Sequence, residues 1–266
     1  MPKWLFVTIS FFFTLYGCTW TGATTHVFKE TSIVEKEKPP KDFIPKEVAI
    51  VSIGDSLTKG VGDRTNRGGY VPYLQQKLES LKSVKEVTFE SFGVRGLRSD
   101  QLLKKLDKEK TMKNALKEAD IVIITIGGND VMKVFQKHIT HLKLSYFEEA
   151  KVEYEKRLQE IIQHIRKENK NIGIVLVGLY NPFHLWFSDI KEIDAIIRNW
   201  NETGKRVIMQ YPQTSFVSIE EVFYNKEDDL LYDDYFHPNE KGYAFIAERL
   251  FYVLEKDLFH LTENIE

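Results

Sequence analysis

Residues 48–58 read Val-Ala-Ile-Val-Ser-Ile-Gly-Asp-Ser-Leu-Thr, and the interpretation of the whole chain starts from this stretch. A short apolar run that ends at a glycine is typical of a β-strand buried on both faces of a sheet. Glycine directly after a strand permits a sharp turn, so Ser56 can stand at the start of a helix with its hydroxyl clear of the sheet. That position suits a nucleophile, although serine and aspartate at such a turn are also ordinary helix caps.

Four similar apolar runs follow, and helical stretches are expected between and after them. The further strands are expected at 87–91, 121–126, 172–177 and 215–218, and the helices at 73–81, 100–116, 146–167, 190–211 and 240–254. Strands that alternate with helices predict right-handed crossovers and a three-layer α/β/α domain around a five-stranded, mostly parallel sheet. The active site of such a domain lies outside the carboxyl ends of the strands.

Three loops at the expected strand ends or helix starts carry unusual residues. They are Ser-Phe-Gly-Val-Arg-Gly at 91–96, Gly-Gly-Asn-Asp at 127–130 and Asp-Tyr-Phe-His-Pro-Asn at 234–239. The glycines let backbone amides approach a ligand closely, and the Asn129 side chain is an uncharged donor suited to a developing oxyanion. Asp234 and His237 are three positions apart, so the carboxylate can meet one ring nitrogen while the other faces outward. Each loop taken alone is also compatible with ordinary turn chemistry.

Together with Gly54–Leu57, and in this order, the three loops resemble the four sequence blocks of the SGNH (GDSL) hydrolase superfamily. The resemblance covers residues 48–254 and implies a flavodoxin-like fold and a serine esterase or lipase that needs no metal or cofactor. The second block departs from the family pattern, because Ser91 stands where the family usually has asparagine. This departure leaves open which hydrogen bonds support that loop.

The resemblance also assigns roles to particular residues. It makes Ser56 the nucleophile and His237 the base, oriented by Asp234. The oxyanion would be held by the backbone N–H of Gly93 and the side-chain amide of Asn129, with the Ser56 N–H.

The loop after the fourth expected strand bears on the substrate. Residues 181–187 read Asn-Pro-Phe-His-Leu-Trp-Phe, which is more aromatic surface than a loop needs. We expect Phe183, Leu185 and Trp186 to line an acyl pocket, with core contact as the alternative. Lysophospholipids or other lipidic esters are therefore the expected substrates. The alternatives are a carbohydrate O-acetyl esterase of the cell envelope and a binding lipoprotein without turnover.

The N-terminus predicts export. Lys3 precedes an apolar run at 4–16, which is too short to span about 30 Å of hydrocarbon but typical of a signal-peptide h-region. Leu15–Cys18 resembles the bacterial lipobox, so we expect a signal peptide at 1–17 and lipidation of Cys18, which would anchor the protein to the outer face of the bacterial cell membrane. Residues 18–45 are then a flexible tether, 46–258 the hydrolase domain and 259–266 a C-terminal tail.

Composition excludes several other classes of protein. Of the 266 residues 42% are hydrophobic and 29% charged, which is close to globular averages and argues against a disordered or polytopic membrane protein. The net charge is −2 and no block of basic residues follows a phosphate backbone, so nucleic acid is not an expected partner. A single cysteine permits no intramolecular disulfide, and His138 and His141 lack a third ligand for a metal.

Overall fold

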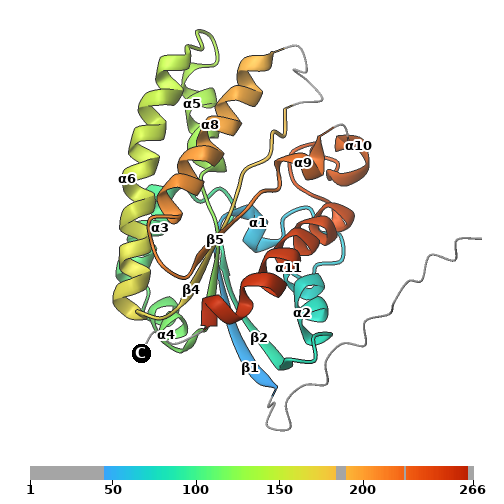
Figure 1. Ribbon diagram of the computed structural model, residues 1–266. Helices are drawn as coiled ribbons and strands as arrows, with labels where there is room; N and C mark the ends of the chain where they lie inside the picture. Colours follow the sequence, from blue (N-terminus) through green and yellow to red (C-terminus); the bar gives the residue numbers. More distant parts are fainter. Residues whose placement is uncertain (1–44, 184–189, 225, 263–266) are drawn as a thin grey trace, which may run out of the picture. The chain divides into compact units, whose positions relative to one another are not determined.

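The computed structural model describes residues 45–183, 190–224 and 226–262, which all belong to one compact unit over residues 43–266 (Figure 1). Its five strands form one sheet in the order β2-β1-β3-β4-β5, and every neighbouring pair is parallel. The strands are β1 (Lys46–Gly54), β2 (Val84–Gly93), β3 (Ile121–Thr125), β4 (Gly173–Val177) and β5 (Thr214–Val217).

Alternate side chains of the strands enter two separate hydrophobic cores, because successive residues of a strand point to opposite faces. Val122 and Ile124 of β3 face one layer of helices: α3 (Ser99–Lys108), α4 (Lys110–Glu118), α5 (Gly128–His138), α6 (Leu144–Glu168) and α8 (Lys191–Ile208). Ile121 and Ile123 face the other layer: α1 (Ser56–Lys59), α2 (Val71–Glu79), α9 (Glu220–Phe223), α10 (Glu227–Leu230) and α11 (Glu240–Thr262).

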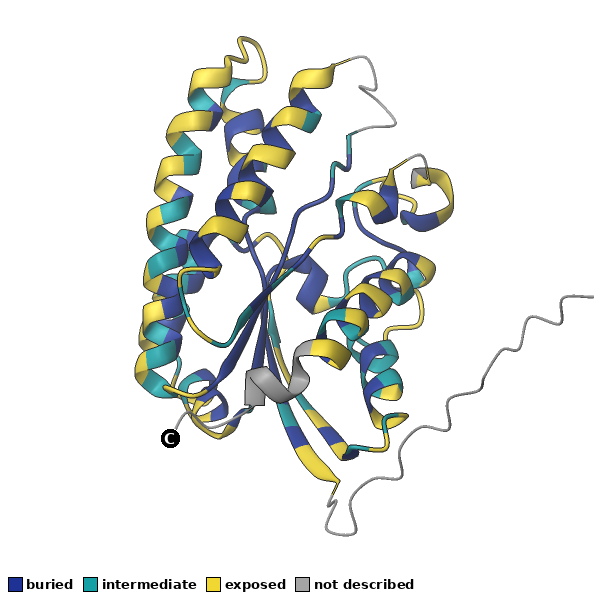
Figure 2. Ribbon diagram, viewed as in Figure 1, coloured by how far each residue is buried: buried dark blue, intermediate teal, exposed yellow. Residues whose placement is uncertain are grey.

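The predicted three-layer α/β/α fold with a parallel sheet is therefore confirmed. Figure 2 shows the central strands buried between helices whose outward faces are exposed. Every residue of β3 and β4 is buried, which explains why both strands are continuous apolar runs in the sequence. None of the helices in the described part of the chain is both long and apolar enough to cross a membrane.

Three of the described helices, α5, α9 and α10, were missing from the sequence prediction. Helix α5 begins at Gly128, directly after Gly127, and we interpreted the Gly-Gly-Asn-Asp stretch only as a loop. Its buried residues Val131, Val134 and Phe135 do have helical spacing. Gly127, just before the helix, has a φ of 113°, a conformation that favours glycine, so the pair of glycines forms both the turn and the helix start. The helical stretch expected at 100–116, for which a break was one of the alternatives, consists of two helices that meet at Glu109.

Candidate active site

Ser56 is the first residue of α1, directly beyond the carboxyl end of β1. Asp55 caps this short helix: its Oδ1 accepts hydrogen bonds from the Leu57 N–H at 3.0 Å and from the Thr125 hydroxyl at 3.0 Å. Gly54 has a φ of 142°, and a Cβ there would lie 2.0 Å from the Thr125 carbonyl oxygen. Only glycine fits this turn, and the turn places Ser56 at the edge of the sheet.

The Asp55 carboxyl is buried beside this serine. Burial raises its pKa to about 7, against the opposing effect of the hydrogen bonds from Leu57 and Thr125. The residue next to Ser56 therefore changes charge near neutral pH.

Asp234 and His237 form the pair that their spacing predicted. His237 Nδ1 lies 2.6 Å from Asp234 Oδ2, and Asp234 Oδ1 accepts the backbone N–H groups of Phe236 at 3.0 Å and His237 at 2.9 Å. Partial burial alone would raise the pKa of Asp234, but these hydrogen bonds outweigh it and hold the pKa below its ordinary value. An ionised carboxylate only accepts hydrogen bonds, so Nδ1 carries the ring proton and Nε2 is left as the basic nitrogen.

Two tyrosines hold the loops of the site, Tyr180 the histidine loop and Tyr243 the turn of Ser56, and the sequence assigned neither of them to the site. The Tyr180 hydroxyl, beyond the end of β4, donates to the Phe236 carbonyl, and burial raises the pKa of that hydroxyl so that it stays protonated. Tyr243 of α11 donates to the Ser56 carbonyl at 3.3 Å and to the Val61 carbonyl at 2.7 Å. Nothing in the spacing of either tyrosine along the sequence points to these bonds.

Further contacts bring the nucleophile turn and the histidine loop together. A Cβ on Gly62 would lie 2.4 Å from the Pro238 carbonyl and 3.1 Å from the His237 Cβ, so the chain after α1 packs directly on the loop. Asn239 caps α11 by accepting the backbone N–H groups of Lys241 and Gly242. Among the described residues no hydrogen bond joins the Ser56 hydroxyl to His237; such bonds are often long before substrate binds.

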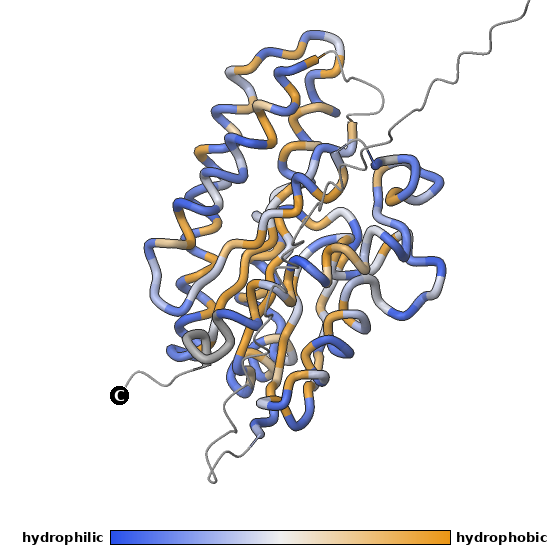
Figure 3. The backbone as a smooth tube through the Cα atoms, turned by 45° about the vertical axis from the view of Figure 1, so that its right-hand side comes forward, coloured by the Kyte–Doolittle hydropathy of each residue, from blue (hydrophilic) through white to orange (hydrophobic). Residues whose placement is uncertain are grey.

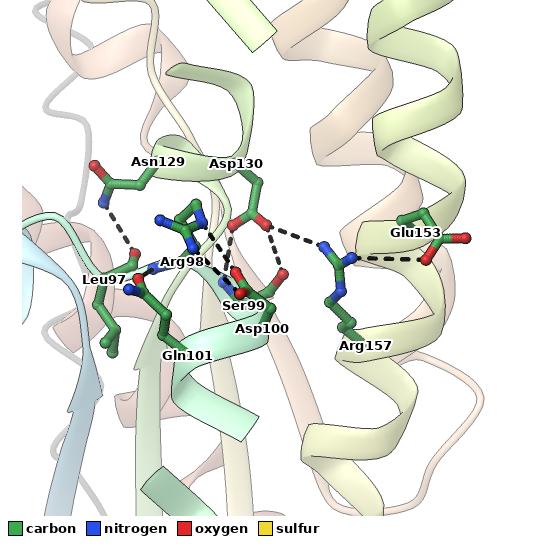
Figure 4. Close-up of polar contacts among 9 residues, drawn as sticks. All are labelled: Leu97, Arg98, Ser99, Asp100, Gln101, Asn129, Asp130, Glu153 and Arg157. Carbon is green, nitrogen blue, oxygen red and sulfur yellow. Dashed lines mark hydrogen bonds and ion pairs between the residues drawn. The ribbon is translucent and has the colours of Figure 1, made fainter. Parts of the chain in front are cut away.

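The predicted oxyanion residues come from the neighbouring strand ends. Asn129 lies in the first turn of α5, and its Nδ2 donates to the Leu97 carbonyl at 3.0 Å (Figure 4). One N–H of that amide remains for a ligand, because an amide nitrogen has two. Gly93 ends β2 so close to α1 that a Cβ there would lie 2.2 Å from the Lys59 nitrogen.

Ser91 resolves the question left by the unusual second block. Its hydroxyl donates to the Thr58 carbonyl at 3.2 Å, and this bond ties the end of β2 to α1. A short hydroxyl thus supports the Gly93 loop in this chain.

Comparison with known proteins agrees with this arrangement of strand-end loops. The model of the GDSL-like lipase/acylhydrolase family matches residues 52–245, which include all four loops. The chain belongs to this family. It is 37% identical over 229 residues to the uncharacterized protein YpmR of Bacillus subtilis, a match that covers 85% of this chain and 89% of the relative.

Two further relatives of the GDSL-family chain are named as lipases. The spore germination lipase LipC of Bacillus licheniformis is 29% identical over 203 residues, which are 75% of this chain and 92% of the relative. The crystal structure of the lipase Lip_vut3 from a goat rumen metagenome is 28% identical, with a TM-score of 0.69, and covers 76% of this chain and 95% of its own. The protein is therefore an ester hydrolase of the GDSL family.

The pocket of this GDSL-family enzyme has largely apolar walls. Ser56 and Asn129 line it together with Val131, Met132, Leu179, Tyr180, Pro182, Phe183, Ile197 and Phe236. Phe183 lines this pocket, and its contact with an acyl chain stays a prediction. Leu185 and Trp186, expected beside it, lie outside the described residues, as does Cys18.

The enzyme shows no metal-binding cluster within its described residues, counting any group of three or more histidine, cysteine, aspartate or glutamate side chains. His138 Nδ1 lies 3.4 Å from His141 Nε2, and the His138 ring stacks on Tyr146. These two histidines lie at the end of α5 and in the turn after it.

Proposed function

We propose that this enzyme hydrolyses acyl esters with a lipidic chain by a Ser-His-Asp mechanism. The observation that carries the proposal is a mainly apolar pocket in which Ser56 meets Asn129, with the Asp234–His237 pair on the adjoining loop. A serine needs a base to attack an ester, and His237 is the histidine whose ring is oriented by a carboxylate beside this pocket.

The mechanism follows from the positions of these groups. His237 Nε2 takes the proton of the Ser56 hydroxyl as Oγ attacks the ester carbonyl, and the Asp234 carboxylate stabilises the imidazolium that forms. The N–H groups of Ser56 and Gly93 and the free N–H of the Asn129 amide bind the oxyanion. His237 then protonates the leaving alcohol. Water, activated by the same histidine, releases the acid and restores Ser56.

The pocket walls support a lipidic acyl group over a carbohydrate acetate. Leu179, Pro182, Phe183 and Ile197 offer an acyl chain mainly aliphatic and aromatic contacts. A glycan would need hydrogen-bonding partners along its length, whereas an acyl chain gains free energy simply by leaving water. Lysophospholipids combine one such chain with an accessible ester bond, so they are the substrates we propose.

We also propose that the mature enzyme is anchored by a lipid on Cys18 at the outer face of the bacterial cell membrane. The proposal rests on the charged start, the apolar run at 4–16 and the single cysteine that follows it. Such an anchor would hold the enzyme where its lipidic substrates are concentrated.

A panel of p-nitrophenyl esters from acetate to palmitate tests the reaction and its chain preference. We expect kcat/KM to rise by up to about fourfold per CH₂ until the pocket is full, because each buried CH₂ contributes about 0.8 kcal/mol. Ser56→Ala should lose at least about 10³-fold in kcat on every ester, with an unchanged circular dichroism spectrum. Phe183→Ala should flatten the rise with chain length and keep most of the activity on acetate.

Each contrary result has a definite meaning. A parent enzyme that prefers acetate would favour the carbohydrate O-acetyl esterase. Ser56→Ala with more than about a tenth of parental kcat would disprove the nucleophile. A folded parent with no turnover on any ester would favour a binding lipoprotein.

A further inference from the structure

The turn between α5 and α6 exposes an unusual group of large apolar side chains. Ile139 is 67% exposed, Leu142 44% and Leu144 55%, and Ile190 just before α8 is 42% exposed. We call these four residues the α5–α6 patch. Single exposed apolar residues are common, but a contiguous group points to an interaction surface.

The patch residues form one surface because they border the same groove. Four buried side chains line this groove together with the patch residues: Phe135, Phe147, Ile193 and Ile196. The groove contains few polar atoms, since Lys143 and Glu192 are the charged residues that line it. Removing such an apolar surface from contact with water lowers the free energy, so covering the groove is favourable.

One ring contact links this groove to the active-site pocket. The Phe135 ring in the groove lies 5.1 Å, centroid to centroid, from the ring of Phe183, which lines the pocket of Ser56. The α5–α6 turn also lies beyond the carboxyl ends of the strands, at the same end of the domain as the site (Figures 1 and 3). A ligand held at the patch is therefore held near the entrance to the pocket.

The charges around the patch have one sign along the turn. Residues 136–144 read Gln-Lys-His-Ile-Thr-His-Leu-Lys-Leu and contain no aspartate or glutamate. Lys137 and Lys143 are both exposed between the apolar residues. Exposed apolar side chains interspersed with lysines are typical of segments that lie at the surface of an anionic membrane.

We propose that the α5–α6 patch docks the enzyme onto an anionic lipid surface and so presents lipid esters to the pocket. The inference rests on the proposed function for its biological purpose, and its physical basis is the apolar and basic turn itself. A second copy of this chain fits the patch less well. In a two-fold interface built on this turn, the lysines of one copy would face those of the other.

Vesicle co-sedimentation tests the docking in the full chain carrying Cys18→Ser, so that no attached lipid contributes. The vesicles are phosphatidylcholine alone or mixed with phosphatidylglycerol, in low and in high salt. We expect the parent to bind the anionic vesicles more tightly and to weaken in high salt. Ile139→Asp with Leu142→Asp should weaken binding about tenfold or more, as should Lys137→Glu with Lys143→Glu.

Matched variants elsewhere on the surface serve as controls. Val152→Asp with Met209→Asp makes the same charge change at two other exposed apolar residues, and Lys82→Glu with Lys108→Glu does so at two other exposed lysines. Both control variants should bind vesicles as the parent does. Any binding by the N-terminal residues is common to all variants, so the differences report the patch.

Activity on a soluble short-chain ester separates the two proposals. The patch variants should keep parental kcat on p-nitrophenyl acetate, and Ser56→Ala should bind vesicles normally. Patch and control variants that bind vesicles equally would overturn the docking proposal and leave the esterase intact. An oligomeric parent whose patch variants are monomeric would also overturn the docking proposal, because the patch would then be an interface between copies of the chain. Vesicle binding that depends on the patch in a chain without ester turnover would refute only the proposed function.

Discussion

At the scale of single residues, the Asp234 carboxylate joins its histidine through both ring and backbone. One carboxylate oxygen lies 2.6 Å from His237 Nδ1, and the other accepts hydrogen bonds from two backbone N–H groups. The backbone bonds fix the loop, and the ring bond fixes the tautomer. The role of Asp234 in turnover can therefore be separated from its role in the loop only by a substitution that keeps its shape.

We predict that Asp234→Asn lowers kcat by about 10³–10⁴-fold with a small effect on stability. The asparagine oxygen can still accept the backbone N–H groups, but its amide cannot stabilise an imidazolium. Asp233→Asn is the control, because Asp233 is the exposed neighbour that pairs with Arg64. The kcat of both variants on p-nitrophenyl butyrate and their thermal melting should be measured. Parental kcat in Asp234→Asn would remove this carboxylate from the mechanism.

Asp55 makes stability depend on pH in the direction opposite to most carboxyl groups. Burial raises its pKa to about 7 in the folded state, from an ordinary 3.8. Between these values the folded protein holds a proton that the unfolded chain has released. The stabilisation is therefore complete below about pH 4 and is lost as the pH rises through about 7.

We predict that Asp55→Asn becomes more stable relative to the parent as the pH rises from 4 to 8. The advantage should grow by up to several kcal/mol, since each unit of pKa difference corresponds to about 1.4 kcal/mol. Urea unfolding followed by tryptophan fluorescence at several pH values measures the difference. A constant difference across this range would show that Asp55 stays ionised throughout.

Asp63 serves as a control, because its contribution to stability changes with pH in the opposite direction to that of Asp55. Burial would raise its pKa, but hydrogen bonds from Thr65, Gly69 and Arg67 lower it below the ordinary value. Its stabilisation is present above the ordinary pKa and is lost as the pH falls. Asp63→Asn should therefore lose stability relative to the parent as the pH rises from acid to neutral.

At the scale of elements, two adjacent residues of α5 hold the loop that precedes α3 (Figure 4). Asn129 donates to the Leu97 carbonyl at 3.0 Å. The buried Asp130 carboxylate accepts the Ser99 N–H at 2.9 Å and the Ser99 hydroxyl at 2.6 Å, and Arg157 of α6 lies 3.6 Å away. Asp130 therefore ties the start of α3 to the helix that carries the oxyanion amide.

We predict that Asp130→Ala destabilises the domain by about 1–3 kcal/mol, because it leaves two buried donors of Ser99 without partners. It should also lower kcat about tenfold while KM changes little, since the Asn129 amide loses its fixed position. Asp130→Asn keeps one acceptor and should recover part of both losses. Asp100→Ala, which removes the pair with Arg98 on the same helix, should cost less than about 1 kcal/mol.

An unchanged kcat in Asp130→Ala would mean that Asn129 is held by Leu97 alone. Equal losses in Asp130→Ala and Asp100→Ala would mean that the effect is general to α3. Chemical denaturation and steady-state kinetics on one short ester distinguish these cases.

At the scale of the whole molecule, the domain carries its own cores and the N-terminus carries the proposed anchor. Among the described residues, both hydrophobic clusters consist of side chains between Val48 and Leu254. We predict that detergent partitioning places the parent in the membrane fraction and moves Cys18→Ala to the aqueous phase or leaves it unprocessed. Mass spectrometry of the parent should find diacylglycerol on Cys18. A mature chain that starts after Cys18 without lipid would disprove the anchor.

The sequence alone predicted the features that depend on neighbouring residues. The buried strands are visible because a parallel sheet covered on both faces needs continuous apolar runs, as in β3. The Asp234–His237 pair was predictable because three residues of chain bring the two side chains together. The order of the four sequence blocks along the chain also predicted the family.

Only the tertiary structure determined what joins these local features into a site. Tyr243 reaches Ser56 across 187 residues of chain, and Tyr180 reaches the histidine loop across 56. The pKa of Asp55 depends on how completely distant elements enclose it, and no local pattern reports that. The α5–α6 patch was equally hidden, because its apolar residues are exposed only where two helices extend past the sheet. Contacts and burial of this kind are properties of packing between distant segments, so they become visible only once the chain has folded.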